Sequence, residues 1–326
     1  MKTIKTITFS GLYAELCRSF VEYKRSMGYD YGRQQTYAIR YLCDYLSETS
    51  PDMVRLTRSL VEGYIKRKPQ ESDSTHGHRV YLIRQFGLYL HSLGYEVYLP
   101  PYDYIKHDKS FVPYIYTKDE IKRIISASEN LPYFRRGPNS QLVYPLMMKI
   151  LFCCGLRISE VLDLKIADVN VEDGILHIRQ SKYNNSRLVP MSRSLTESCQ
   201  DYYAKMDYYS GKAGYFFEVT LGVPYKRTTC YSRFRYFLKQ AKIWHGGRGK
   251  GPRLHDARHT YAVYALDHMV KQGMDIYCAL PMLSAYMGHR TIESTEKYVR
   301  LVPSFHQDII NTMQPIYKGV FPEVTD

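Results

Sequence analysis

Apolar residues recur with helical spacing through the first ninety residues of the chain. Leu12, Leu16 and Phe20 fall four residues apart. Similar spacing appears in three later stretches, which are residues 41–46, 57–67 and 75–93. This spacing is typical of amphipathic helices that bury one face against their neighbours. Because turn-forming residues separate the stretches, we predict a unit of four helices.

Residues 99–116 break this pattern, because they combine three prolines with mixed charges. Proline disfavours helix in the residue before it, so this stretch is predicted to be an extended linker that closes a helical domain of residues 1–110. Thr117 is followed three residues later by Glu120. This is the pattern of a capping box, and it predicts a helix over residues 119–128.

The second predicted domain, residues 111–326, is mainly helical with one small antiparallel sheet. Residues 142–154 form a long apolar stretch that stops at Gly155, which is typical of a buried helix and its C-terminal glycine. Polar and apolar residues alternate over 175–180, and a second strand is predicted from 187 after a polar turn. Beyond residue 191 the pattern is helical again, apart from the glycine-rich basic loop 246–253. The predicted fold class is therefore mainly α with a small antiparallel β-sheet, in two domains.

The charge of the chain favours a polyanionic partner. The 326 residues have a formal net charge of +13. Residues 1–110 hold 16 Lys and Arg against 12 Asp and Glu, and residues 111–326 hold 29 against 20. Both domains are therefore expected to contact nucleic acid. No uncharged apolar run approaches the ~18 residues of a membrane span, and seven scattered cysteines favour a reduced, cytoplasmic protein without a membrane partner.

A set of cationic and phenolic residues in the second domain could bind a phosphate and react with it. Arg157 lies between two apolar helices, His255 and Arg258 are three apart on a predicted helix, and Tyr298 follows His289 by nine residues. The set lacks the paired carboxylates that a metal-dependent nuclease needs, so neither a metal nor another cofactor is predicted. Taken singly, each residue has an ordinary explanation, such as a surface ion pair or a packed tyrosine among 33.

The order and local context of these residues favour a common site. Arg157 and Glu160 lie in the segment 153–164, Lys182 lies in 181–190, His255 and Arg258 lie in 255–260, and His289 and Tyr298 lie in 287–298. In this order the segments resemble the motifs of the tyrosine recombinase (phage integrase) family. The likeness covers residues 111–300, and the helical unit before it is similar in size to the core-binding domain of that family.

The resemblance implies that Tyr298 attacks a DNA phosphodiester and forms a 3′-phosphotyrosine. Arg157 and Arg258 would each donate two hydrogen bonds to the phosphate oxygens, and His289 would donate a further one. His255 is expected to accept the proton of Tyr298, and Lys182 is expected to protonate the leaving 5′ oxygen. Glu160 would orient a cationic neighbour and fix a tautomer. The covalent bond conserves the phosphodiester energy, so no ATP is needed.

The expected partner is double-stranded DNA with a specific core site. Candidate DNA contacts are four basic residues, Arg187, Arg248, Lys250 and Arg253. The resemblance also implies a homo-oligomer on DNA, with a tetrameric synapse and accessory factors, in which the C-terminal tail 304–326 docks on a neighbour. The leading hypothesis is an integrase of a mobile genetic element. Two alternatives stay open, which are a type IB topoisomerase-like enzyme that only relaxes DNA and a catalytically silent DNA-binding protein.

Overall fold

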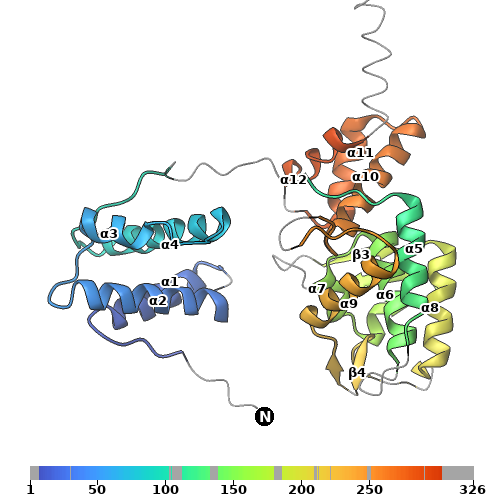
Figure 1. Cartoon of the computed structure of the whole chain (residues 1–326), viewed down its shortest axis with the longest axis horizontal. Coiled ribbons are helices and arrows are strands. Elements are labelled where there is room, and N and C mark those ends of the chain that lie inside the picture. The colour runs from blue at the N-terminus through green and yellow to red at the C-terminus, as the bar shows by residue number, and fades with distance from the viewer. Residues whose placement is uncertain are drawn as a thin grey trace, which may run out of the picture. The chain divides into compact units, whose positions relative to one another are not determined.

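The chain forms two compact units, Met1–Phe111 and Val112–Asp326, in the computed structural model (Figure 1). The structure describes residues 7–29, 31–102, 104, 112–132, 139–179, 186–208, 211, 213–220, 222–247, 251–289 and 291–302. No helix in these ranges is long and apolar enough to cross a membrane.

The N-terminal unit contains four helices, as predicted from the apolar spacing. They are α1 (Ala14–Ser26), α2 (Arg33–Thr49), α3 (Arg58–Ile65) and α4 (Asp73–Ser92). The hydroxyl of Thr57 caps α3 by accepting a hydrogen bond from the Leu60 N–H, and Ser72 caps α4 in the same way. The helices bury a shared core that includes Phe20, Leu42 and Phe86.

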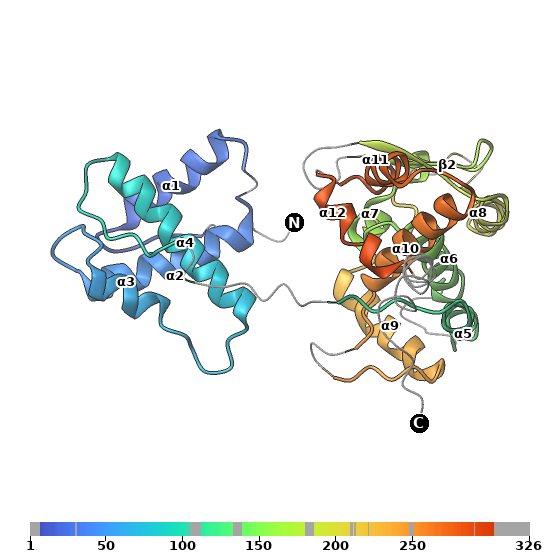
Figure 2. The same ribbon diagram turned by 90° about the horizontal axis from the view of Figure 1, so that it is seen from above.

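The centre of the second unit is α6 (Ser140–Cys154), in which eleven of fifteen residues are buried. Its main neighbours are α5 (Lys118–Glu129), α8 (Arg193–Lys205) and α10 (Asp256–Lys271) (Figure 2). The predicted capping box at Thr117 and Glu120 opens α5, which confirms that prediction. Tyr116 lies just before this box and is fully buried in the core of the second unit.

The predicted hairpin is present as part of a three-stranded antiparallel sheet. The strands are β1 (Val169–Asn170), β2 (Ile175–Ile178) and β3 (Arg187–Pro190), in that spatial order. The register pairs Ile178 with Arg187, so Arg187 opens the returning strand. Residues 180–185 of the connecting turn lie outside the described residues.

The prediction of helix throughout the rest of the chain was wrong for residues 218–224. Two further strands, β4 (Glu218–Thr220) and β5 (Val223–Pro224), form a second small sheet. Strands of two or three residues are too short to show an alternating pattern, so neither strand is visible in the sequence.

The remaining elements lie between α6 and β1 or after β5. They are η1 (Ile166–Asp168), α7 (Ile158–Asp163), α9 (Arg227–Gln240), α11 (Ile276–Met287), α12 (Glu293–Glu296) and η3 (Val299–Leu301). Helices α10 and α11 pack together over a small core that includes Leu266, Leu283 and Tyr298. The candidate nucleophile therefore lies on the same small core as α10, which carries Arg258 and directly follows His255.

Candidate active site

Gly155 fixes the direction in which the chain enters the site. It ends α6 in the left-handed conformation, with φ +60°, and a Cβ there would lie 2.5 Å from the ring of Tyr261. Only glycine fits both conditions. The Gly155 carbonyl accepts a hydrogen bond from Arg258 Nη1 at 2.8 Å, and the next turn places Arg157 directly before α7. A single residue therefore positions both candidate phosphate-binding arginines.

Three arginines meet the C-terminal end of α11. Helix ends leave carbonyl oxygens without intrahelical partners, and cations are favoured beside them. The carbonyls of residues 286–288 accept, in order, from Arg187 Nε at 2.8 Å, from Arg258 Nη2, and from Arg157 Nη2 at 3.3 Å. Helix α11 in this way brings together arginines from β3, α10 and the start of α7.

Glu160 is the common counter-charge of these arginines. Its side chain is 4% exposed, and its carboxylate accepts from Arg157 Nη1 at 2.7 Å and from Arg187 Nη2 at 3.0 Å. Arg258 Nη1 lies 3.9 Å away. Burial alone would raise the pKa of Glu160, but the hydrogen bonds and charges of these neighbours lower it below its ordinary value. The carboxylate therefore stays ionised and orients cations. Among the described contacts none joins it to a histidine ring.

Tyr298 is buried next to this cationic cluster. The residue is 1% exposed, and its hydroxyl oxygen lies 3.0 Å from His259 Nδ1. The His289 ring lies nearly parallel to the tyrosine ring, at 24°, with 6.2 Å between centroids. Burial raises the pKa of Tyr298 to about 12, against the opposing charges of Arg258 and Arg157. The hydroxyl is therefore protonated at pH 7.

His289 is held by a buried threonine. Its Nδ1 lies 2.7 Å from Oγ1 of Thr295, which is fully buried. Burial, followed by the charges of Arg258 and Arg157, lowers the pKa of His289 to about 3. The ring is therefore neutral at pH 7. Thr295 contacts Nδ1 and does not contact Nε2.

His255 lies directly before α10 and does not contact the Tyr298 hydroxyl in any described interaction. Its ring meets the His259 ring edge to face, with 4.9 Å between centroids. Although part of the His255 ring is exposed to solvent, the protein packed around the rest of it and the charges of Arg258 and Arg253 lower its pKa to about 4. From the sequence, His255 was expected to accept the proton of Tyr298. In the structure it is His259 that contacts the Tyr298 hydroxyl.

The candidate DNA contacts have different surroundings. The Arg187 side chain is 9% exposed and is engaged by Glu160 and the end of α11, so it lies inside the site. Arg253 is 43% exposed and pairs with Asp256 at 2.8 Å. Arg248 and Lys250, like the predicted catalytic Lys182, lie outside the described residues.

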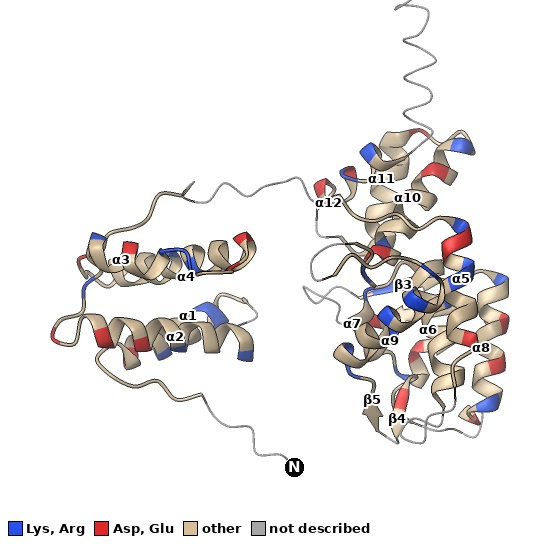
Figure 3. Ribbon diagram, in the orientation of Figure 1, with Lys and Arg blue, Asp and Glu red and all other residues tan. Residues whose placement is uncertain are grey.

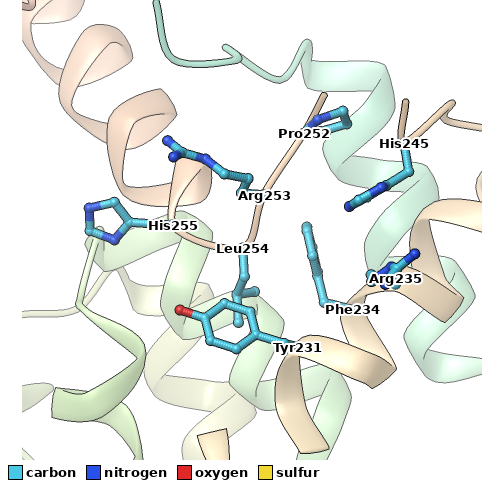
Figure 4. Close-up of a pocket in the computed structure, with 8 residues that line it drawn as sticks. All are labelled: Tyr231, Phe234, Arg235, His245, Pro252, Arg253, Leu254 and His255. Atoms are coloured by element: carbon cyan, nitrogen blue, oxygen red, sulfur yellow. The ribbon is translucent and has the colours of Figure 1, made fainter. Parts of the chain in front are cut away.

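A cavity of about 290 Å³ adjoins His255 (Figure 4). Side chains of α9 and of the segment before α10 line it, among them Tyr231, Phe234, His245 and Arg253. Its walls are largely aromatic and basic. No group of three or more His, Cys, Asp or Glu side chains is placed to hold a metal ion in the described part of the chain.

Two side chains near the nucleophile were missed at the sequence level. His259 follows Arg258 and lies one helical turn after His255, so its spacing was the available signal. Lys297 precedes the nucleophile, and its Nζ lies 5.2 Å from the centre of the Tyr298 ring. Burial, followed by the charge of Arg258, lowers the pKa of Lys297.

Comparisons with known proteins identify the family of this chain. The model of the phage integrase family matches residues 115–304. A putative integrase/recombinase, y4rB, of Sinorhizobium fredii is 25% identical over 307 residues, which cover 93% of this chain and 97% of that protein. The tyrosine recombinase XerA of Pyrococcus horikoshii is 25% identical over 205 residues, which cover 61% of each chain.

Solved structures with a similar fold include two integrases bound to DNA. The Tn1549 transposon integrase in complex with transposon right end DNA has a TM-score of 0.62 at 16% identity, over 87% of this chain and 94% of that one. A lambda integrase dimer bound to a core site has a TM-score of 0.56 at 16% identity, over 85% and 95%. The family model matches more than half of this chain, and the fold is similar to that of the solved integrases. The chain therefore belongs to the phage integrase family of tyrosine recombinases.

Proposed function

We propose that this chain is a site-specific DNA recombinase that breaks and rejoins DNA through Tyr298. The observation that carries the proposal is the convergence of Arg157, Arg258, His289 and Tyr298 around the end of α11. These residues come from positions spread over about 140 residues of sequence. No packing requirement explains why two arginines should be gathered beside a buried phenol, whereas a phosphodiester requires both.

The chemistry follows from the charges of these groups. Arg157 and Arg258 each offer a planar pair of donors to the non-bridging oxygens, and they stabilise the charge that builds in the transition state. His289 donates from Nε2 to the same phosphate. Tyr298 attacks phosphorus, the 5′ oxygen leaves, and a 3′-phosphotyrosine remains. Because this ester conserves the energy of the original bond, rejoining needs no ATP.

Access to the nucleophile requires a local movement. Tyr298 is 1% exposed, while Arg157 at 21% lies at the open edge of the cluster. Tyr298 lies between two short elements, α12 and η3, of four and three residues. Such short helices are held mainly by packing, so we infer that DNA binding loosens the packing over Tyr298 while its hydroxyl stays within reach of His259.

DNA binding is assigned to basic elements around the site. Helix α9 carries Arg227, Arg233, Arg235 and Lys239 and no acidic residue (Figure 3). It lines the cavity beside His255 together with Arg253. We propose that α9 and the loop 246–253 contact the DNA that presents the scissile phosphate. The proposal places this reaction in the cytoplasm, where the seven free cysteines stay reduced.

Assembly on DNA is proposed to use the C-terminal tail. Helix α11 exposes apolar side chains, with Tyr277 at 84% and Met282 at 54%. The tail 304–326 lies outside the described residues, but Ile309, Ile310 and Met313 recur there with near-helical spacing. We expect deletion of residues 304–326 to impair synapsis and to spare binding to a single core site. Recombination at the wild-type rate would refute this role.

The proposed activity is tested by trapping the covalent intermediate. DNA that flanks the gene is searched for inverted core sites, and a nicked suicide duplex that carries one such site is incubated with the protein. We expect a covalent adduct with the wild type and none with Tyr298→Phe, which should still bind DNA. Tyr286→Phe is the matched control and should form the adduct, because Tyr286 stacks on Tyr261 at 5.4 Å. An adduct with Tyr298→Phe would refute the assignment.

Two further results separate the alternatives. Strand exchange between two marked duplexes is expected of a recombinase, whereas a topoisomerase-like enzyme would relax supercoiled DNA without exchange. A catalytically silent DNA-binding protein would bind the duplex and give no adduct at all.

A further inference from the structure

His259 is the described residue in hydrogen-bond contact with the nucleophilic oxygen. Its Nδ1 lies 3.0 Å from the Tyr298 hydroxyl, and the two rings are 5.6 Å apart at 54°. His259 is 6% exposed and follows Arg258 on α10. We propose that His259, rather than His255, accepts the proton of Tyr298 during cleavage and returns it during rejoining. The inference rests on the function proposed above.

The charges around His259 determine which atom holds the proton. The ring faces His255, Lys297, Arg253 and Arg258, and burial together with these groups lowers its pKa to about 3. The imidazole is therefore neutral, with a hydrogen on one nitrogen only. If Nδ1 carried that hydrogen, the hydrogen of the buried phenol would need another acceptor, and none is found among the described contacts of Tyr298. Nδ1 is therefore the acceptor, and Nε2 carries the hydrogen.

The position of His255 suits a different task. It lies before the first turn of α10, its ring is partly exposed, and it borders the cavity that faces α9 (Figure 4). Between it and the phenol lies His259, whose ring it meets edge to face. An exposed imidazole at that place can approach the DNA phosphate, whereas the buried one can approach only the tyrosine.

Cleavage moves two protons, and rejoining returns both. The Tyr298 Oη–H bond breaks, and the proton moves to His259 Nδ1 while the Oη–P bond forms. The bond from phosphorus to the 5′ oxygen breaks, and that oxygen takes a proton from a separate donor, the role predicted for Lys182. On rejoining, the 5′ hydroxyl attacks phosphorus and returns a proton to that donor, and the phenol leaves with the proton of His259.

The proton stays on the phenol of the free protein, and a phosphate held by the arginines favours its transfer. Without DNA the pKa of the phenol is about 12 and that of the imidazole about 3, so the proton stays on oxygen. A phosphate anion between the arginines offsets the positive charges that hold the imidazole pKa down. Bond formation to phosphorus also makes the phenol oxygen more acidic. Transfer therefore coincides with attack, which protects the free enzyme from carrying a reactive phenolate.

His259→Asn separates proton transfer from positioning. The asparagine oxygen lies close to the place of Nδ1 and accepts a hydrogen bond, but it cannot carry the proton at pH 7. We expect single-turnover cleavage of the suicide duplex to slow by about 100-fold or more, since general base catalysis contributes about 10²–10⁴. Binding to the duplex should be unchanged. The rate of the variant should recover as pH rises toward the pKa of Tyr298, because solvent then takes the proton.

The effect of His259→Asn is compared with the effect of the same change at another position of α10. His268→Asn makes the same change on α10 away from the tyrosine and should cleave as the wild type does. His259→Gln serves as a second variant if the asparagine variant does not fold. Wild-type cleavage by both His259 variants, or slow cleavage that does not recover at high pH, would overturn the inference while the proposed function stands. Absence of an adduct with the wild-type protein would instead overturn the proposed function.

Discussion

Replacing Glu160 by glutamine tests whether one carboxylate holds the arginine cluster together. The change keeps the size of the side chain and removes its charge, while Arg157 and Arg187 stay within 3.0 Å of it and Arg258 within 3.9 Å. Three guanidinium groups would then share a buried region without a counter-charge. Removing one partner of a buried pair costs about 3–5 kcal/mol. Because the amide oxygen can still accept one hydrogen bond, we expect the lower value, about 3 kcal/mol.

Urea unfolding monitored by pulse proteolysis measures this loss in the second unit alone, since the fragments of the two units differ in size. At a slope of about 2 kcal/mol per molar urea, a loss of 3 kcal/mol moves the midpoint down by about 1–2 M. Sulfate should restore more stability to Glu160→Gln than to the wild type, because the anion replaces the missing charge. Cleavage should slow by about 100-fold, as expected when transition-state donors are misplaced.

The matched control is Glu71→Gln. Glu71 forms a buried pair with Arg79 at 2.7 Å in the N-terminal unit, so its loss should destabilise that unit and leave cleavage of bound DNA unchanged. A wild-type urea midpoint for Glu160→Gln, or equal sulfate effects on Glu160→Gln and the wild type, would show that the arginines do not depend on this carboxylate.

Three further predictions concern the residues around the nucleophile. Thr295→Val removes the hydroxyl that contacts His289, and a thermal melt should report a loss of about 1–3 kcal/mol together with slower cleavage; unchanged cleavage would show that this contact does not orient the histidine. Gly155→Ala forces a strained backbone and a clash with Tyr261, and it should cost about 2–5 kcal/mol in urea unfolding. The pKa of His259 is about 3 in the folded chain and about 6.5 in the unfolded chain, so the unfolded state binds more protons below pH 6.5. Stability should therefore fall as pH drops, by about 2 kcal/mol at pH 5, and His259→Asn should show a shallower decline.

The sequence was sufficient to predict the elements that depend on local pattern. The four N-terminal helices, the capping box of α5 and the end of α6 at Gly155 all follow from spacing within one or two helical turns. The strands β4 and β5 do not, because so few residues carry no periodic signal.

Most residues of the candidate site were predicted from the sequence, but their contacts with one another were not. Glu160 was expected to orient one cation, yet it joins arginines from three elements, one of them 27 residues away in sequence. Arg187 was predicted to contact DNA, whereas tertiary packing encloses its side chain. His259 could not be paired with a tyrosine 39 residues later without knowing how α10 and η3 meet.

The carbonyls at the end of α11 also determine which substitutions the site tolerates. Side chains at positions 286 and 287 take no part in the three arginine contacts, so replacements there are limited by packing and, at Tyr286, by its side-chain hydrogen bonds with Tyr261 and Cys154. Position 288 is different, because a Cβ on Gly288 would lie 2.9 Å from the Arg187 guanidinium, and its φ of +63° disfavours other residues. In a library of variants across this helix end, function should therefore survive many apolar exchanges at the first two positions and almost none at the third.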